Sequence, residues 1–465
     1  MVRLLLLVVP LVALAGCQTE NSAFCANPAN AGMQGCPGNP SNGGPCSNNS
    51  ECKAAGFPVC DTSMNGGMCV QCTTADSHVC AGMTPVCTPQ DTCTACTKHA
   101  DCMESNACMP DGSCALSTDV AYVDGSKTDN PMCTKQMPCT KLDKALAAKP
   151  IVKVTGTVMD RVMLNNRNGT ILADPGATLQ PPAGNDGTLL DIRGTSDLKI
   201  YDLQISNATG GSGVGVSLSD TSKVAMTRVT ISGNGDRGIQ INNNTSSSLT
   251  CTQCVVASNG AQGIDAGSGS VTLTQSMIHD NTGGGIHIAG STAFHIVSNF
   301  VYNNGSSTKA SAAGIIISVD AQAPGAAPNQ LDFNSVSGNK TVDMVKGIQC
   351  TSGTPLVATS NLVWSNGAIP LTDAEVVGTQ CSFMYSDVGP AVISGVTNIS
   401  MDPGFKDLAG GNLHLNSGSP ALGKADPTIS LGGLAAKDID GEARVARTGM
   451  GADVGADQYY PPGMP

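Results

Sequence analysis

The chain has 465 residues, which is enough for a large core and a second module. It carries 24 Lys and Arg against 36 Asp and Glu, and the net charge of −12 repels nucleic-acid phosphates, so we expect no nucleic-acid partner. Aromatic residues make up only 3%, which favours an interior filled by β-branched and small side chains.

The amino-terminal sequence MVRLLLLVVPLVALAGC is typical of a bacterial lipoprotein signal. Its apolar run is too short for a spanning helix. Leu14-Ala15-Gly16-Cys17 resembles a lipobox, which implies cleavage after residue 16 and lipid attachment to Cys17. Since Gln18 follows, resemblance to the bacterial sorting rule implies a lipid anchor in the outer membrane, on its periplasmic or surface side. The alternative is an ordinary signal peptide with a chance cysteine.

Residues 17–45 are predicted to be a disordered tether that carries the lipidated Cys17. They are rich in Asn, Gly and Pro and cannot bury enough apolar surface to order themselves. The membrane is therefore an expected partner through the anchor.

Residues 46–114 form a cysteine-rich triple repeat. Such short repeats lack a core, and disulfides persist in exported proteins, so we expect two disulfides per repeat. Zinc is the alternative, because Cys69-x-x-Cys72 and Cys93-x-x-Cys96 show ligand-like spacing. The module resembles cysteine-rich stalks of bacterial surface proteins. Its twelve cysteines are Cys46, Cys52, Cys60, Cys69, Cys72, Cys80, Cys87, Cys93, Cys96, Cys102, Cys108 and Cys114.

A strand and a short helix are predicted at the start of the next segment, residues 115–400. Thr140 is the expected N-cap of the helix, and Leu142, Ala145 and Leu146 lie on one helical face. The helix would shield the open end of the sheets that follow. Cys133 and Cys139 are expected to form a disulfide there, and a long-range disulfide is expected between Cys350 and Cys381.

Residues 198–317 repeat one pattern with a period near 23 residues. Each repeat reaches an asparagine and then a Gly-Val or Gly-Ile pair, which gives three short strands per coil. Alternate residues form inward aliphatic columns, such as Ile205, Ile231, Val256, Ile278 and Val301 along the second strand. The aligned asparagines are Asn207, Asn234, Asn259, Asn281 and Asn304.

This period, with Asn and Gly turns and no helical pattern between the strands, predicts an all-β solenoid of three parallel sheets. Over roughly residues 120–420 the chain resembles the right-handed parallel β-helix proteins of the pectate-lyase-like superfamily. The repeat is specific for this fold and unspecific for activity. The asparagines are interpreted as a stack whose members tolerate left-handed turn geometry.

Two further features of the coils leave alternatives open. Cys251 and Cys254 point inward on either side of a corner, as a disulfide or as packed thiols. The second sheet points Val255, Met277 and Phe300 outward, a stripe that is either covered by the insertion 309–327 or free for a partner.

Residues 401–465 resemble the choice-of-anchor Q module of exported bacterial β-helices. The resemblance rests on motifs such as Asp402-Pro403-Gly404-Phe405 and Gly418-Ser419-Pro420-Ala421. It implies a closing module in which Asp440, Arg444 and Asp453 form an internal ion-pair set. A calcium loop is the alternative, but the spacing does not match an EF-hand, so no metal site is predicted.

One outward column of the third strand carries groups suited to chemistry. It runs Ser217, Gln240, Asp265, His287 and Ile316, and Arg237 lies in the turn that leads into it. Asp265, His287 and Arg237 are the candidate catalytic residues of a polysaccharide lyase or hydrolase, for which calcium would be the only cofactor. The alternative is a solvated polar column with an ion pair.

A structural, adhesive or glycan-binding surface protein without a cofactor is the favoured interpretation, with a polysaccharide or surface protein as partner.

Overall fold

The computed structural model describes residues 44–63, 67–308, 314–342, 347–367, 375–390 and 397–461. The chain divides into two compact units, one ending at Leu116 and the other beginning at Ser117. The predicted signal peptide, Cys17 and nearly all of the tether lie outside the described residues. Within these ranges, no helix is both long enough and apolar enough to cross a membrane.

The first unit is held together by disulfides, as predicted. In each repeat the first cysteine pairs with the third and the second with the fourth: Cys46–Cys60, Cys52–Cys69, Cys72–Cys87, Cys80–Cys93, Cys96–Cys108 and Cys102–Cys114. Zinc is thereby excluded for these thiols. The short elements are η2 (Asn49–Glu51), β1 (Val59–Asp61), β2 (Met68–Val70), η3 (Ser77–Val79), β3 (Val86–Cys87), β4 (Cys93–Thr94) and η4 (His99–Asp101).

The second unit begins with η5 (Ser117–Asp119), β5 (Val120–Asp124) and α2 (Leu142–Ala148). Leu142, Ala145 and Leu146 are buried, as predicted, and the Cys133–Cys139 disulfide forms. The predicted N-cap is wrong. Lys141 occupies that position without a side-chain cap, and the helix starts one residue later than predicted. The backbone N–H of Thr140 donates to Asp129.

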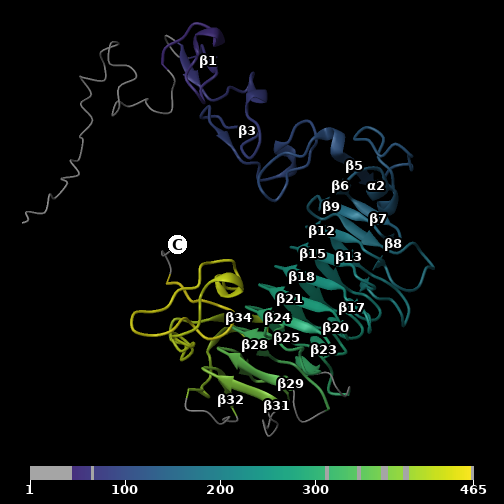
Figure 1. Cartoon of the computed structure of the whole chain (residues 1–465), viewed down its shortest axis with the longest axis vertical. Helices are drawn as coiled ribbons and strands as arrows, with labels where there is room; N and C mark the ends of the chain where they lie inside the picture. The colour runs from purple at the N-terminus through teal and green to yellow at the C-terminus, as the bar shows by residue number, and fades with distance from the viewer. Residues whose placement is uncertain are drawn as a thin grey trace, which may run out of the picture. The chain divides into compact units, whose positions relative to one another are not determined.

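Three strands per coil stack into parallel ladders, visible as successive rungs in Figure 1. The second strands form a ten-stranded sheet. Its members are β7 (Thr157–Met159), β10 (Thr178–Gln180), β13 (Gln204–Ser206), β16 (Thr230–Ser232), β19 (Val255–Ala257), β22 (Met277–His279), β25 (Phe300–Tyr302), β28 (Ser335–Ser337), β30 (Leu362–Trp364) and β32 (Asp387–Gly389).

The first and third strands share the larger, eighteen-stranded sheet. First strands are β6 (Ile151–Thr155), β9 (Asn168–Ala173), β12 (Asp197–Tyr201), β15 (Lys223–Thr227), β18 (Ser248–Thr252), β21 (Ser270–Thr274), β24 (Ala293–Val297) and β27 (Gln330–Asp332). Third strands are β8 (Val162–Asn165), β11 (Leu190–Arg193), β14 (Val216–Leu218), β17 (Ile239–Ile241), β20 (Ile264–Ala266), β23 (Ile286–Gly290) and β26 (Ile315–Val319). In the last coils, the long strands β29 (Ile348–Thr359) and β31 (Val376–Met384) each run through the positions of a third strand and of the first strand that follows it.

The predicted inward columns are confirmed by the strand register. Ile205, Ile231, Val256, Ile278 and Val301 are partners in successive coils, and all five are fully buried. They belong to one continuous core that spans the coils.

Of the two alternatives for Cys251 and Cys254, the structure shows packed thiols and not a disulfide. Both are free, buried thiols that pack in this core. The Cys350–Cys381 disulfide joins β29 to β31.

A ladder of buried asparagine side chains follows the second strands. The ladder runs through Asn234, Asn259, Asn281, Asn304, Asn339 and Asn366. From Asn259 onward, each amide oxygen accepts hydrogen bonds from the backbone and side chain of the asparagine one coil earlier. The predicted stack is therefore confirmed for Asn234, Asn259, Asn281 and Asn304, whereas the predicted left-handed geometry is found only at Asn207. The residue before each ladder asparagine takes the positive φ, as Ser258 does at 57°. Asn207 takes that turn position, and Ala208 occupies the ladder column.

The carboxyl-terminal residues 397–461 lie against the flank of the coils (Figure 1). They include β33 (Phe405–Asp407), β34 (Asn412–Leu415) and η6 (Gly433–Ala435). Phe300 on the second sheet packs with Leu413, Ile439 and Ala456, and Met277 packs at the edge of this cluster. Met277 and Phe300 of the outward stripe are therefore covered by this segment. Coverage by the insertion 309–327, the first alternative, is wrong for Met277 and Phe300.

Candidate functional site

The outward column of the third strands brings the candidate residues together as predicted. Gln240 of β17 is the strand partner of Asp265 of β20, and Asp265 is the partner of His287 of β23. Parallel strands lie about 4.8 Å apart, so outward side chains in one column touch their neighbours. The column continues to Ser217, which is buried, and to Ile316.

The carboxylate of Asp265 is the centre of a four-residue network. Its Oδ1 lies 2.8 Å from Nδ1 of His287, and its Oδ2 accepts a hydrogen bond of 2.5 Å from Nε of Arg237. Arg237 also donates from Nη1 to Asp236 at 3.0 Å. The turn before β17 supplies both Asp236 and Arg237, which explains how one guanidinium reaches two carboxylates.

The electrostatics of the network favour charged, paired groups. Burial raises the pKa of Asp265, but hydrogen bonds from His287 and Arg237 outweigh it and leave this pKa below its usual value. Burial lowers the pKa of Arg237, but the hydrogen bond and charge of Asp265, together with Asp236, raise it above its usual value. Arg237 therefore stays protonated and is not suited to act as a general base.

His287 is the reactive end of the network. Its side chain is 32% exposed, and Asp265 engages Nδ1. Among the described residues, Nε2 has no hydrogen-bond partner. A histidine oriented by a carboxylate in this way can bind a hydroxyl group or move a proton at Nε2. The acid/base role predicted for this residue and a binding role would both use this atom.

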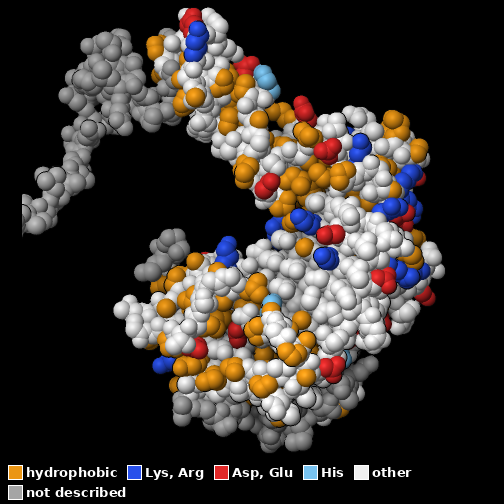
Figure 2. Space-filling model, viewed as in Figure 1, with side chains coloured by type: hydrophobic (Ala, Val, Ile, Leu, Met, Phe, Trp, Pro, Cys, Tyr) orange, Lys and Arg blue, Asp and Glu red, His pale blue; other side chains and the backbone are white. Residues whose placement is uncertain are grey.

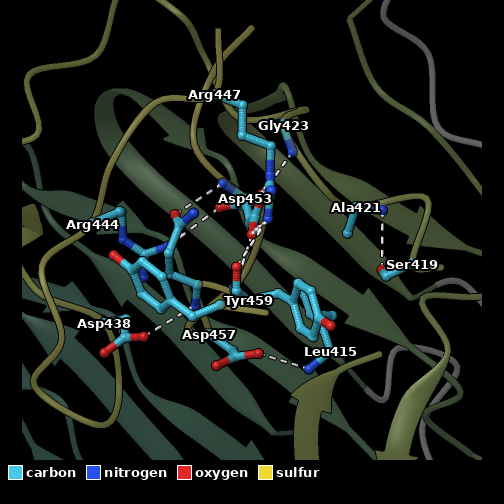
Figure 3. A network of polar contacts seen from close by, with 12 residues as sticks. Leu415, Ser419, Ala421, Gly423, Asp438, Arg444, Arg447, Asp453, Asp457 and Tyr459 are labelled. Atoms are coloured by element: carbon cyan, nitrogen blue, oxygen red, sulfur yellow. Dashed lines mark hydrogen bonds and ion pairs between the residues drawn. The ribbon is translucent and has the colours of Figure 1, made fainter. Parts of the chain in front are cut away.

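A second polar network lies in the carboxyl-terminal segment and joins residues 415 to 459 (Figure 3). Asp453 is fully buried and is held by Arg447 through two hydrogen bonds of 2.6 Å. Asp440 pairs with His414 at 2.9 Å. The predicted set of Asp440, Arg444 and Asp453 is therefore not one ion-pair cluster, since the two carboxylates have other partners.

Arg444 instead fastens the segment to the coils. It donates to the carbonyl oxygens of Asp453 and Ala456 and to Oγ of Ser298, and its guanidinium lies 4.3 Å from the ring centroid of Phe333. Burial lowers the pKa of Arg444 to about 10. The sequence did not indicate this contact, because it joins residues more than a hundred positions apart.

One group in this segment has the composition of a metal site. Ligand atoms of His414, Asp440 and Asp457 lie within 4.8 Å of one another. However, His414 is already hydrogen-bonded through Nε2 to Asp440 and through Nδ1 to Asn412. These contacts satisfy the ring without an ion, so we assign no cofactor to it. The other groups of this kind consist of disulfide cysteines.

Comparison with known proteins found a matching family model and a similar solved structure. The model of the family described as "Right handed beta helix region" matches residues 164–304. The fold is a right-handed parallel β-helix. Among solved structures, the β-helix is similar to the crystal structure of pectate lyase Pel9A, with 12% identity, a TM-score of 0.45, and coverage of 73% of this chain and 96% of that chain. No curated protein matches the sequence.

Proposed function

We propose that this chain is a lipid-anchored surface protein whose β-helix binds a glycan on the outward face of the third strands. The observation that carries the proposal is the closed network around Asp265. It leaves Nε2 of His287 and the amide of the neighbouring Gln240 at the surface, while the guanidinium and both carboxylates are paired inside the network. Such a face offers hydrogen bonds to hydroxyl groups without an exposed electrophile.

The anchor part of the proposal rests on Leu14-Ala15-Gly16-Cys17. Lipid on Cys17 would hold the protein at the outer membrane, and the tether and disulfide-rich unit would separate the β-helix from the bilayer. Replacing Cys17 with serine is expected to move the protein from the membrane fraction to the soluble fraction. Fractionation followed by immunoblotting measures this, and an unchanged membrane fraction would reject the anchor.

Glycan binding is tested with the chain from Gln18 onward, which keeps every described residue. Retention on immobilised plant, algal and bacterial polysaccharides should fall by roughly fivefold in His287→Ala, the effect of one lost hydrogen bond worth about 1 kcal/mol. Thr250→Ala, on the outward face of β18, is the matched control and should retain binding. Failure to retain any polymer would refute the binding proposal.

An acid/base enzyme is the second candidate, and the exposed Nε2 of His287 is the observation in its favour. The size distribution of each polymer, measured with and without calcium in the same experiment, separates the two functions. Shortening that is lost in Asp265→Ala and His287→Ala would make the protein a hydrolase or lyase. Retention without shortening supports binding.

A further inference from the structure

The coils that carry this face are almost free of charged residues. Residues 238–308 contain no Lys or Arg and only two carboxylates, Asp265 and Asp280. The preceding coils, residues 151–237, contain eight Lys and Arg. The change in composition falls within one continuous β-helix, so it distinguishes one part of the surface from another. In Figure 2 the surface over β17 and β20 is mostly white, which marks uncharged polar side chains and backbone.

Both carboxylates in these coils are engaged. Asp265 is held by Arg237 and His287, as described above. Asp280 lies 2.7 Å from Nδ1 of His279, whose ring stacks on Tyr302 on the second sheet. The outward face of the third strands therefore presents Gln240, His287 and a carboxylate that is already shared between two partners.

Charge pairing restricts the ligands that this face can bind. A polyuronate or sulfated glycan is held by cations that are free to contact its anionic groups. Here Arg237, the cation of the network around Asp265, is committed to Asp236 and Asp265. A polycationic glycan would require accessible carboxylates, and Asp265 already accepts from two donors. Neither class finds a complementary charge, and the net charge of −12 further disfavours anions.

We infer that the ligand of this face is an uncharged polysaccharide. The inference rests on the proposed glycan-binding function and specifies its ligand class. The polymer contacts the amide of Gln240 and Nε2 of His287, which lie two coils apart in one column. Such a chain is recognised by neutral hydrogen bonds, so its affinity does not depend on ionic screening.

Salt dependence provides the test. The chain from Gln18 onward is applied to a neutral β-glucan, to polygalacturonate and to chitosan at about 20 mM and about 300 mM NaCl. The higher salt concentration shortens the Debye length and so weakens binding that depends on charge. Retention on the β-glucan is expected to stay within about twofold between the two salts. Gln240→Ala and His287→Ala should each weaken it roughly fivefold, whereas Thr250→Ala should not.

The outcomes separate this inference from the function on which it rests. Salt-sensitive retention on polygalacturonate or chitosan, with none on the neutral polymer, would overturn the uncharged ligand and leave glycan binding intact. Retention on none of the polymers would overturn both. Retention on the β-glucan that Gln240→Ala and His287→Ala leave unchanged would place the ligand elsewhere on the β-helix and reject this face.

Discussion

Replacing Asn281 with alanine is expected to lower the free energy of unfolding by about 3–5 kcal/mol. The side chain is fully buried in the asparagine ladder. Its Oδ1 accepts from the backbone N–H and Nδ2 of Asn259, and its Nδ2 donates to the carbonyl of Val256 and to Oδ1 of Asn304. Alanine removes all four hydrogen bonds and leaves the buried backbone N–H of Asn259 without its acceptor, which costs more than that bond contributes. Nδ2 of Asn259 keeps its bond to Ile231, and Oδ1 of Asn304 keeps the bond from the backbone N–H of residue 281.

Chemical denaturation followed by circular dichroism measures this effect. The matched control is Asn243→Ala, an exposed asparagine outside the ladder, which should change the stability by less than about 0.5 kcal/mol. Asn281→Asp tests the role of the amide, because a carboxylate cannot donate to Val256 or Asn304. Equal midpoints for Asn281→Ala and Asn243→Ala would show that the ladder contributes nothing to stability.

The ladder also shows how far the sequence predicts this fold. Alternation of apolar residues placed the inward columns correctly, because a strand exposes successive side chains to opposite faces and a buried face permits only one register. The asparagines were harder to place. Local propensity favours Asn in the left-handed turn, as at Asn207, but a buried amide that bridges two coils makes more hydrogen bonds. The neighbouring residue therefore takes the turn.

The candidate site was predictable in part, because the period of the repeat places equivalent residues of successive coils in one column. Asp265 and His287 share one column, so the repeat alone placed them on adjacent coils. The repeat did not indicate that Arg237 divides its hydrogen bonds between Asp236 and Asp265, since turn geometry decides this. It also did not indicate which segment covers Phe300. Outward apolar residues signalled a cover, but the docking of residues 397–461 depends on contacts such as Arg444 with Phe333.

Replacing Asp457 with asparagine is expected to stabilise the protein at pH 8, by up to about 3 kcal/mol. Burial raises the pKa of this carboxyl from 3.8 to about 6. An acid with a raised pKa in the folded state destabilises the fold when it is ionised. The cost is complete above pH 6 and disappears as the pH falls to about 4. Asparagine removes the charge and keeps an oxygen to accept the 2.7 Å hydrogen bond from Leu415.

The pH profile of Asp457→Asn provides the check, with Asp440→Asn as a control of opposite sign. The hydrogen bond from His414 lowers the pKa of Asp440, so its ionised form stabilises the fold above the usual carboxyl pKa. The midpoint of Asp457→Asn should exceed that of the parent chain at pH 8 and converge with it near pH 4, whereas Asp440→Asn should fall below the parent at pH 8. A loss of stability in both variants at pH 8 would show that the folded protein favours the ionised form of Asp457, against the effect of its burial.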